Sequence, residues 1–244
     1  MKEAEFRLLE RIEEDHWWFV GKRLILRALL DGQPVGARLL DLGCGTGGIL
    51  RDWTDRGACV GMDGSPLALR ICKRRGFSVL ARGDLERLPF RDGAFDTIVL
   101  MDVLEHLDDD RGLLRGAARL CAPGGRVVVS VPAFQLLWSR HDETFGHRRR
   151  YRARQLEAIF DAAGLERERT TYTNFLVFPV ALVWRVLSRV LRLGRSGPGH
   201  DFWPVPGWLN ALLVCAYRLE AWWLARADLP LGVSVVCIGR RPAA

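Results

Sequence analysis

The sequence lacks the features that would fix its fold by covalent cross-links or by a membrane. Its six cysteines are scattered over 244 residues, and no two have the close spacing of a metal knuckle or a redox pair. This distribution indicates reduced thiols in a cytoplasmic protein and predicts no metal site. No run of about 18 uncharged apolar residues occurs, so a simple membrane-spanning helix is not expected. Internal repeats and low-complexity tracts are also absent, which favours one ordinary folded unit.

The charge of the chain is unbalanced. Lysine and arginine together number 36 against 29 acids, and the net charge is +7. This excess favours anionic partners, which include nucleic acid, phosphorylated small molecules and acidic lipid headgroups. Charge alone does not choose among these three classes.

Short apolar runs alternate with helical stretches from residue 38 onward, and this pattern predicts a doubly wound α/β fold. The predicted strands are 38–42, 58–62, 78–81, 96–101, 125–131, 166–173 and 232–239. The predicted helices are 5–30 with a break around 16–21, then 47–56, 65–75, 108–121 and 152–163, and two longer apolar helices at 175–193 and 207–227.

These elements predict a single domain in three parts. Residues 1–31 form an N-terminal helical cap. Residues 32–173 and 231–244 form a Rossmann-like core with a seven-stranded sheet. Residues 174–230 form an apolar helical insertion between the last two strands, and most of the tryptophans of the second half lie in it.

The sharpest motif is LLDLGCGTG at 39–47, where a buried strand runs into alternating glycines. Glycine suits this turn because a Cβ would block a ligand and because the turn needs unusual backbone angles. The helix expected at 47–56 would then offer free N–H groups to an anionic group. Asp63 follows about 20 residues later, at the end of the second strand, where an acid can accept from two ribose hydroxyls. Asp84 ends the third strand, where a carboxylate can accept from an adenine amino group. The pattern therefore predicts a ligand that carries adenosine.

Together with FDTIVLMDVLEHLDD at 95–109 and PGGRVVVSVP at 123–132, this turn resembles class I methyltransferases, which use S-adenosylmethionine (SAM). Three strictly alternating glycines are closer to that pattern than to the G-x-G-x-x-G of dinucleotide-binding proteins. The resemblance covers about 38–172 and 231–239. It implies the following cofactor contacts: Asp41, Gly43, Cys44, Gly45 and Gly47 at the methionine end, Asp63 and Gly64 at the ribose, Asp84 and Leu85 at the adenine, and Met101, Asp102 and Val103 along the cofactor.

The motif WWFVGKR at 17–23 is similar to one in many uncharacterised bacterial members of the superfamily. In one interpretation an aromatic side chain, for which we take Trp18, covers the cofactor and Arg23 pairs with its carboxylate. In the other interpretation the same residues form a helix–helix packing cluster.

Candidate catalytic groups are concentrated after the fifth strand, in SRHDETFGHRRRY at 139–151, which resembles the same bacterial group. A hydroxyl acceptor must lose its proton, and histidine and carboxylates are the usual bases near neutral pH. We predict that His141 or His147 is this base and that Asp142 orients it. The alternative is that one histidine caps a helix and the other packs in the core.

Substrate contacts are predicted from the same region. Arg149, Arg150 and Tyr151 belong to a basic run that suits a phosphate or headgroup on the acceptor, and a solvated helix face is the alternative. His106, in LEHL, can reach the pocket, although a structural role is the stronger interpretation.

The insertion is the main clue to the substrate. On the predicted helix 182–193, Arg185, Arg189 and Arg192 share one face and apolar residues cover much of the rest. A basic amphipathic helix flanked by tryptophan suits an anionic membrane surface. In class I methyltransferases the connection between the last two strands emerges at the edge of the sheet where the cofactor binds. The two helices therefore form either a membrane hairpin over the site, or a homodimer interface or lid.

The function predicted from these features is SAM-dependent methyl transfer, to oxygen, on an apolar or lipid-linked small molecule. The expected location is the cytoplasm, at the inner face of the membrane if the hairpin interpretation holds. The alternatives are a soluble small-molecule methyltransferase and a SAM-binding partner subunit without catalysis. Nucleic acid ranks low as a substrate because the basic residues are interleaved with long apolar segments. In addition, the chain lacks the N/D-P-P-Y/W motif of DNA enzymes that methylate amino groups.

Overall fold

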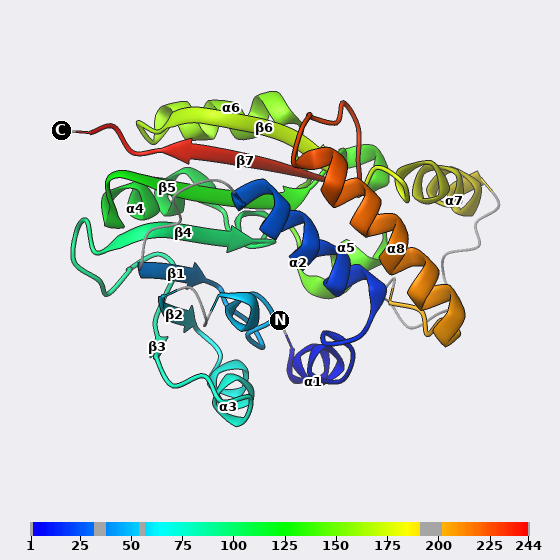
Figure 1. Ribbon diagram of the computed structural model, residues 1–244, viewed down its shortest axis with the longest axis horizontal. Coiled ribbons are helices and arrows are strands. Elements are labelled where there is room, and N and C mark those ends of the chain that lie inside the picture. Colours follow the sequence, from blue (N-terminus) through cyan, green and yellow to red (C-terminus); the bar gives the residue numbers. More distant parts are fainter. Residues whose placement is uncertain (1, 32–37, 54–56, 191–201, 244) are drawn as a thin grey trace.

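The structure, a computed structural model, describes residues 2–31, 38–53, 57–190 and 202–243. Its centre is a seven-stranded sheet with the strand order β3-β2-β1-β4-β5-β7-β6 (Figure 1). The strands are β1 (Arg38–Leu42), β2 (Ala58–Asp63), β3 (Leu80–Arg82), β4 (Phe95–Met101), β5 (Cys121–Pro132), β6 (Glu166–Thr173) and β7 (Ser234–Arg240). Neighbouring strands are parallel except that β7 runs antiparallel to β5 and β6. The predicted doubly wound α/β fold is confirmed.

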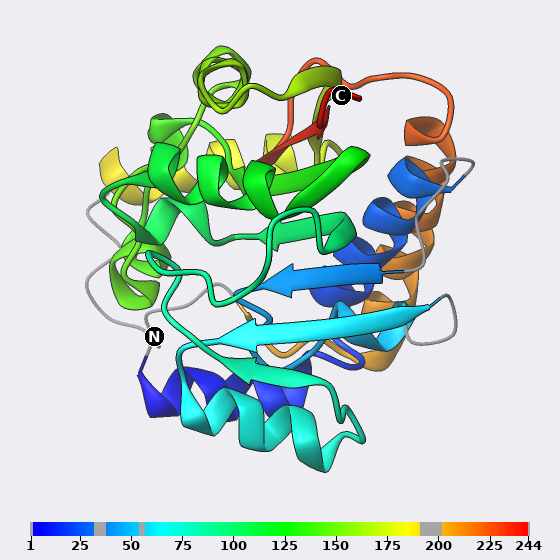
Figure 2. The same ribbon diagram turned by 90° about the vertical axis from the view of Figure 1, so that its left-hand side faces the viewer.

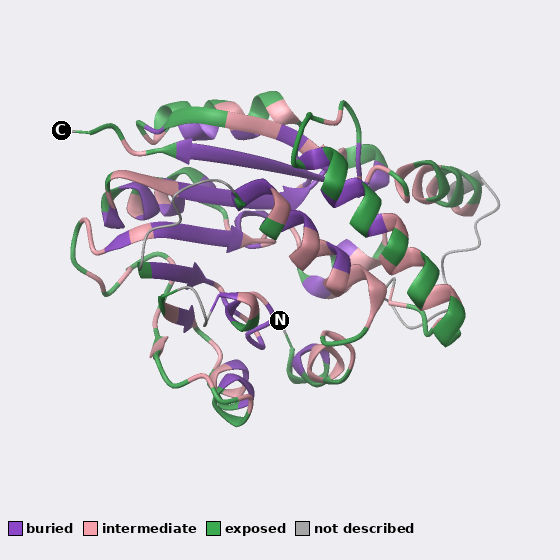
Figure 3. Cartoon of the chain, in the orientation of Figure 1, coloured by how far each residue is buried: buried purple, intermediate pink, exposed green. Residues whose placement is uncertain are grey.

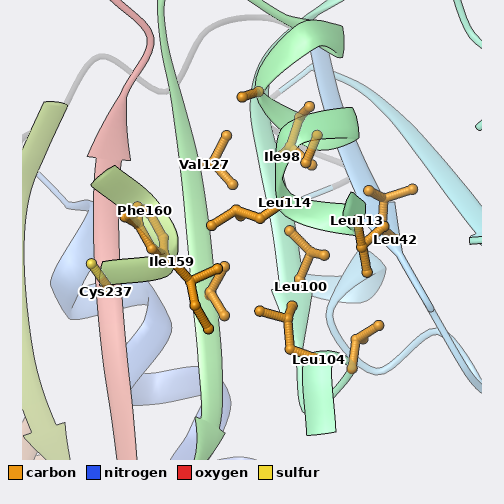
Figure 4. Packing of buried hydrophobic residues seen from close by; sticks show 14 of the residues in the cluster. Leu42, Ile98, Leu100, Leu104, Leu113, Leu114, Val127, Ile159, Phe160 and Cys237 are labelled. Carbon is orange, nitrogen blue, oxygen red and sulfur yellow. The ribbon is translucent and has the colours of Figure 1, made fainter. Parts of the chain in front are cut away.

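Helices cover both faces of the sheet (Figures 1 and 2). On one face lie α4 (Asp110–Leu120) and α6 (Ala153–Ala162), whose leucines, isoleucine and phenylalanine pack on the apolar side chains of β1, β4 and β5 (Figure 4). On the other face α2 (Trp17–Leu30) and α8 (Gly207–Leu224) lie side by side. The central strands are rich in β-branched residues because helices bury them from both sides.

The remaining helices are peripheral. The helix α1 (Glu3–Ile12) packs against α3 (Pro66–Arg74). The short α5 (Arg140–Phe145) and the longer α7 (Phe178–Val190) lie beyond the carboxyl ends of the parallel strands (Figure 1). Cofactors of doubly wound folds bind at that end of the sheet.

Several predicted boundaries were wrong. The helix expected at 47–56 is replaced by a single 3-10 turn, η1 (Leu50–Asp52), and residues 54–56 lie outside the described part. Gly43, Gly45 and Gly47 all have positive φ, which ends regular structure, so the expected row of helix N-terminal N–H groups does not form. The N-terminal break lies before Trp17, because His16 caps α2 by accepting from the amide of Trp18.

Two other boundaries also differ from the prediction. The fifth strand begins at Cys121, four residues before the predicted start at residue 125, and its register against β4 shifts. The face predicted from Arg185, Arg189 and Arg192 falls partly outside the description, which omits residues 191–201 and the side chain of Arg189.

The helix α8 is anchored in the core by one of its faces. Tyr217 and Leu224 are buried against α2 and the sheet. The carboxylate of Glu220, also buried, accepts hydrogen bonds from the backbone amides of Asn174 (2.5 Å), Phe175 (3.1 Å) and Leu176 (3.3 Å). Burial raises the pKa of Glu220, and the three amide bonds counteract this. The anchor joins α8 to the chain just after β6.

The contact between α2 and α8 depends on Gly21. A Cβ built on Gly21 would lie 2.3 Å from the Tyr217 ring. We expect Gly21→Ala to lower the free energy of unfolding by about 1–3 kcal/mol, because the two helices must separate or the ring must leave its rotamer. Urea denaturation measures this change. The matched control is Gly207→Ala on α8, where a Cβ meets nothing within 4 Å; a loss of equal size in both variants would contradict the assignment.

Candidate active site at the carboxyl ends of the strands

A cavity of about 640 Å³ opens at the carboxyl ends of β1 and β4. Five separate parts of the chain line it: the N-terminal helices, the glycine turn after β1, the end of β4, the segment after β5, and the insertion between β6 and β7. The cavity therefore brings together most of the motifs that the sequence analysis singled out. It is also large enough for a cofactor-sized ligand.

The glycine turn forms the floor of the cavity. The amides of Gly43 and Cys44 both donate to the carbonyl of Met62, at 2.8 and 3.0 Å, and this ties the turn to β2. The side of Gly45 that faces outward is open, because a Cβ there would meet nothing within 4 Å. A ligand can approach the backbone closely at this point, as a glycine turn allows.

Asp41 is the strongest sign of a ligand beside this turn. It lies at the end of β1 and lines the cavity, yet it is 2% exposed and its Oδ2 has no hydrogen-bond partner in the part of the chain that the structure describes. Burial first, and then the charges of Asp63 and Glu13, raise the pKa of Asp41 to about 8. A buried, unpartnered acid is costly unless something satisfies it. A cationic group bound at the turn would do so.

Asp63 holds the turn from below. Its Oδ2 accepts from the amide of Gly45 (2.9 Å) and its Oδ1 from the amide of Ser65 (2.7 Å). It does not line the cavity, and neither do its neighbour Gly64 nor Gly47, which packs on Phe77. The predicted ribose contact is therefore not part of this cavity, and the carboxylate instead fixes the backbone around it.

The predicted adenine contacts also lie outside the cavity. Asp84 accepts from the amide of Glu86 at 2.9 Å, and Leu85 packs against the core beneath the sheet edge. The cavity as it stands contains the methionine end of the predicted cofactor site and extends away from its adenine end.

The end of β4 forms one wall. Met101 and Asp102 line the cavity, whereas Val103 lies under the turn, where a Cβ on Gly43 would meet it at 2.7 Å. Asp102 has a positive φ of 55° and forms an ion pair with Lys22 of α2. Lys22 was not singled out from the sequence; the WWFVGKR motif holds it, but no local signal points to a partner 80 residues away.

The N-terminal helices cover the turn. Glu13, just after α1, accepts hydrogen bonds from the hydroxyl of Thr46 in the turn and from Arg75. Arg23 donates to the carbonyls of residues 13 and 14 and lies 3.6 Å from a carboxylate oxygen of Asp52. Arg23 does line the cavity, but its guanidinium holds the chain in place. The expected pairing with a cofactor carboxylate would require it to leave these partners.

The aromatic part of the same motif has two roles at once. Trp17 and Trp18 line the cavity and also belong to the packing cluster of α2 and α8. Trp18 carries the ammonium of Lys22 over its ring, 5.3 Å from the centroid. The two interpretations offered by the sequence therefore do not exclude each other.

The segment after β5 supplies the predicted catalytic group. Asp142 on α5 is fully buried and accepts from His147 Nδ1 (2.9 Å) and from two nitrogens of Arg150 (2.8 and 3.0 Å). Burial alone would raise the pKa of Asp142, but the bonds from His147 and Arg150 hold it well below its usual range. Asp142 thus orients His147 as a charged acceptor. Both His147 and His141 line the cavity, and His141 stacks on Phe145.

The predicted substrate residues divide into two groups. Arg150 and His106 line the cavity. Arg149 and Tyr151 do not; both bind Asp110 at the start of α4, at 3.2 and 2.8 Å, so their side chains join two helical segments. Burial, followed by the charge of His147, lowers the pKa of His106 to about 4, and the two imidazole rings are 4.9 Å apart.

The insertion forms the apolar roof. The contributing side chains are Leu176, Val177, Val180, Ala181 and Trp184 around α7, with Phe202, Trp203 and Leu213 beyond it. Phe202 contacts the rings of His16 and Phe19 on one side and of His141 on the other. The carbonyl of Trp203 lies 3.2 Å from His16 Nε2. The roof therefore joins the N-terminal motif to the predicted catalytic segment.

Comparison with known proteins agrees with this geometry. Residues 40–129 match the family described as "Methyltransferase domain". A demethylmenaquinone methyltransferase of Tropheryma whipplei is 36% identical over 129 residues, 50% of this chain and 50% of that protein. A ubiquinone biosynthesis O-methyltransferase of Xanthomonas oryzae is 32% identical over 102 residues, 39% of this chain and 43% of that protein. The matched part thus spans about half the length of these curated relatives.

A solved structure extends the likeness to the whole fold. It is a chain from the complex of the Haloferax volcanii Trm112 methyltransferase activator with a methyltransferase, superposed with a TM-score of 0.64 at 19% identity over 99% of this chain and 96% of that one. Residues 40–129 thus match a methyltransferase domain, and the whole chain has the fold of class I SAM-dependent methyltransferases, whose cofactor is S-adenosylmethionine. The unpartnered Asp41 Oδ2 and the open backbone at Gly45 fit the cationic, methionine end of that cofactor.

Proposed function

We propose that this chain transfers a methyl group from SAM to a hydroxyl oxygen of an apolar or lipid-linked small molecule at a membrane surface. One observation carries the proposal. A single cavity has an acidic, glycine-lined floor at one end, the histidines His141 and His147 in its wall and an apolar roof from the insertion. This arrangement suits a cationic cofactor, an acceptor that must lose a proton, and an apolar body attached to that acceptor.

Each end of the cavity has a defined task in this proposal. Bound SAM supplies an electrophilic methyl group, and its transfer yields a methyl ether and S-adenosylhomocysteine. Asp41 accepts the ammonium of the methionine moiety. His141 or His147 receives the acceptor's proton, and the Asp142 contact keeps the Nε2 of His147 directed away from the core. The aromatic roof excludes water from the reacting atoms.

The apolar roof and the relatives support an apolar acceptor. Side chains of α7 and the segment at 202–203 line the part of the cavity next to the histidines. The two curated relatives are named for demethylmenaquinone and for ubiquinone biosynthesis. A quinone-like ring with a polyprenyl tail has the chemistry that this roof would select.

The outer face of the insertion supports contact with a membrane. Large apolar side chains on α7, on α8 and between them are about half exposed or more, and Figure 3 shows the outward turns of both helices as exposed. Those that do not also line the cavity are Val183, Trp208, Leu212, Leu219, Trp222 and Trp223. Arg226 lies over the Trp222 ring, 4.3 Å from its centroid. Exposed tryptophan beside arginine is typical of proteins at lipid interfaces. Among the described residues, no helix has the length and apolar content needed to cross a membrane.

Flotation with vesicles tests the membrane part. We expect the full chain to float with phosphatidylglycerol-containing vesicles, and the triple variant Trp208→Ser, Trp222→Ser, Trp223→Ser to stay in solution. These side chains lie on the exposed face, so the fold should remain intact, unlike in a deletion of the insertion, which would remove Tyr217 from the core. Val79→Ser, an equally exposed apolar residue next to β3, is the control.

The result also separates the alternative functions. If the wild-type chain does not float but sediments as a dimer that the triple variant breaks, the insertion is a homodimer interface and the membrane part is wrong. If it does neither, the insertion acts as a lid of a soluble enzyme.

The methyl transfer itself is tested by product formation. Incubation of the full chain with isotopically labelled SAM and native lipid extracts should label an apolar molecule on oxygen, as mass spectrometry can show. His141→Gln and His147→Gln are each expected to leave SAM binding intact; the variant of the true base should lose turnover by about 10²–10⁴-fold. SAM binding without any labelled product would instead favour a non-catalytic partner subunit.

A further inference from the structure

Three potential metal ligands meet beside the cavity, and two of them, His106 and His147, line it. Glu105 and His106 lie in the 3-10 turn after β4, and His147 lies just after α5. One ligand atom from each lies within 4.8 Å of the other two. Three atoms so placed surround a point no more than about 2.8 Å from each, and small side-chain movements would reach the 2.0–2.2 Å of imidazole and carboxylate bonds to a metal.

Glu105 is the independent sign that something binds here. It is 0% exposed, and neither of its carboxylate oxygens has a hydrogen-bond partner among the described residues. The nearby carboxylate of Asp102 repels a negative charge on Glu105, and Asp102 already forms an ion pair with Lys22. A buried carboxylate with both oxygens unpartnered is strongly unfavourable unless a proton or a cation neutralises it. The two imidazoles next to it provide further lone pairs for a cation.

One of the two histidines is already held in the way that is typical of a metal ligand. His147 Nδ1 is bound to Asp142 Oδ1 at 2.9 Å, which leaves Nε2 available. The ring of His106 lies beside it, with the two ring centroids 4.9 Å apart, and both rings line the cavity. Asp142 is fixed in turn by Arg150 and by the amide of Ser139. Carboxylates and carbonyls that hold the far nitrogen of a histidine are the usual supports of metal-binding imidazoles.

We propose that Glu105, His106 and His147 bind a divalent first-row transition metal ion. Two imidazoles and one carboxylate favour zinc, iron, manganese or cobalt over magnesium or calcium, which prefer oxygen ligands. Three protein ligands leave coordination positions open toward the cavity. No metal site was predicted from the sequence, because its cysteines lack the close spacing of a metal knuckle. The ligands proposed here are instead a glutamate and two histidines, and the third lies about 40 residues after the first two.

A metal ion at this site would limit the class of acceptor that the protein can methylate, and this inference rests on the proposed function. An acceptor oxygen bound at an open position would be held beside the methyl donor, and the ion would lower the pKa of its hydroxyl. His147 would then be a ligand, which leaves His141 as the group that receives the proton. The substrate class becomes a hydroxyl compound that can coordinate a metal.

Titration of the purified full chain with Co²⁺ tests the site without any turnover. We expect d–d absorption bands in the visible range that saturate at one equivalent, are displaced by Zn²⁺, and are unaffected by excess Mg²⁺. Glu105→Gln and His147→Gln should each weaken Co²⁺ binding by at least about tenfold. His141→Gln, which changes a histidine in the same cavity outside the cluster, should bind Co²⁺ like the wild type.

Two further measurements make the outcome decisive. Thermal unfolding and SAM calorimetry are recorded for every variant, so that lost metal binding is not confused with lost folding. Glu105→Gln is isosteric and removes no hydrogen bond present in the structure, so it decides the matter even if His147→Gln is unstable. Equal Co²⁺ binding by the wild type and Glu105→Gln, or no binding by the wild type, overturns the metal site. Neither result affects SAM binding or the methyl transfer expected of the proposed function.

Discussion

Asp142→Ala is expected to lower the free energy of unfolding by about 3–5 kcal/mol. Asp142 is fully buried, and its carboxylate neutralises Arg150, whose side chain is 5% exposed. Among the described residues, removal of the acid leaves that buried guanidinium with one remaining acceptor, the carbonyl of Ala133 at 3.2 Å. The same change frees His147 and removes the cap at the start of α5. Urea denaturation followed by far-UV circular dichroism measures the loss.

Glu143→Ala is the matched control for this prediction. Glu143 is the next residue on α5, is also acidic and lies on the exposed side of the helix. Its replacement should change the free energy of unfolding by no more than about 0.5 kcal/mol. A loss below about 1 kcal/mol for Asp142→Ala would mean that water reaches Arg150 and that the cluster is not a buried ion pair.

Asp41→Asn is expected to weaken SAM binding by about 1.5–3 kcal/mol, which is roughly 10- to 150-fold in the dissociation constant. The wild-type residue lines the cavity and has a carboxylate oxygen without a partner among the described residues, which can form a charge-assisted bond with the cofactor's ammonium. Asparagine keeps the shape but carries no charge. Calorimetry measures the two affinities, and the surface change Asp92→Asn, far from the cavity, should leave the affinity unaltered.

The pH dependence of binding follows from the same group. Because the pKa of Asp41 is raised to about 8 without ligand, this carboxyl is protonated at pH 6 and must release its proton to the solvent when the cation binds. The affinity of the wild type should therefore rise between pH 6 and about 8 and level off above that. Calorimetry in two buffers of different ionisation enthalpy would detect the released proton. An affinity that does not change over this range, or one that changes equally in Asp41→Asn, would contradict the assignment.

Stability without ligand should show the opposite trend. A raised folded-state pKa means that the native state holds a proton which the unfolded chain has released, so the stabilisation is full below about pH 4 and is lost as the pH rises through about 8. Asparagine binds no such proton, so Asp41→Asn removes this loss of stability with rising pH. Its free energy of unfolding should depend less on pH between 4 and 8 than that of the wild type.

The parts of the fold that the sequence predicted are those with local signals. Apolar runs such as 38–42 and 96–101 were placed to within a residue, because strands buried by helices on both sides need such runs wherever they occur. The glycine turn was also placed correctly, because glycine adopts the positive φ of residues 43, 45 and 47 without a steric cost. The helix after it was predicted from composition and was wrong, because local propensity did not account for how the turn ends.

The parts of the site that the sequence missed depend on distant contacts. Lys22 with Asp102, and Glu13 with Thr46 and Arg75, join segments 30 to 80 residues apart, and no spacing rule connects them. Glu105 looked like one acid in an ordinary motif; only its burial without a partner singles it out. Asp63 and Asp84 had the expected positions at strand ends, yet neither side chain lines the cavity, because strand position does not set side-chain direction.

The packing of α8 on the core limits which parts of the insertion can be replaced. The inner face of α8 packs in the same apolar cluster as α2. Among the described residues, α7 and the outer face of α8 contribute no buried side chain to that cluster. Exchange of the whole segment for one without Tyr217 would remove the ring that packs on Gly21, and we expect it to destabilise the fold. Changes to α7 side chains that line the cavity, such as Val180 and Trp184, would alter the roof without this cost.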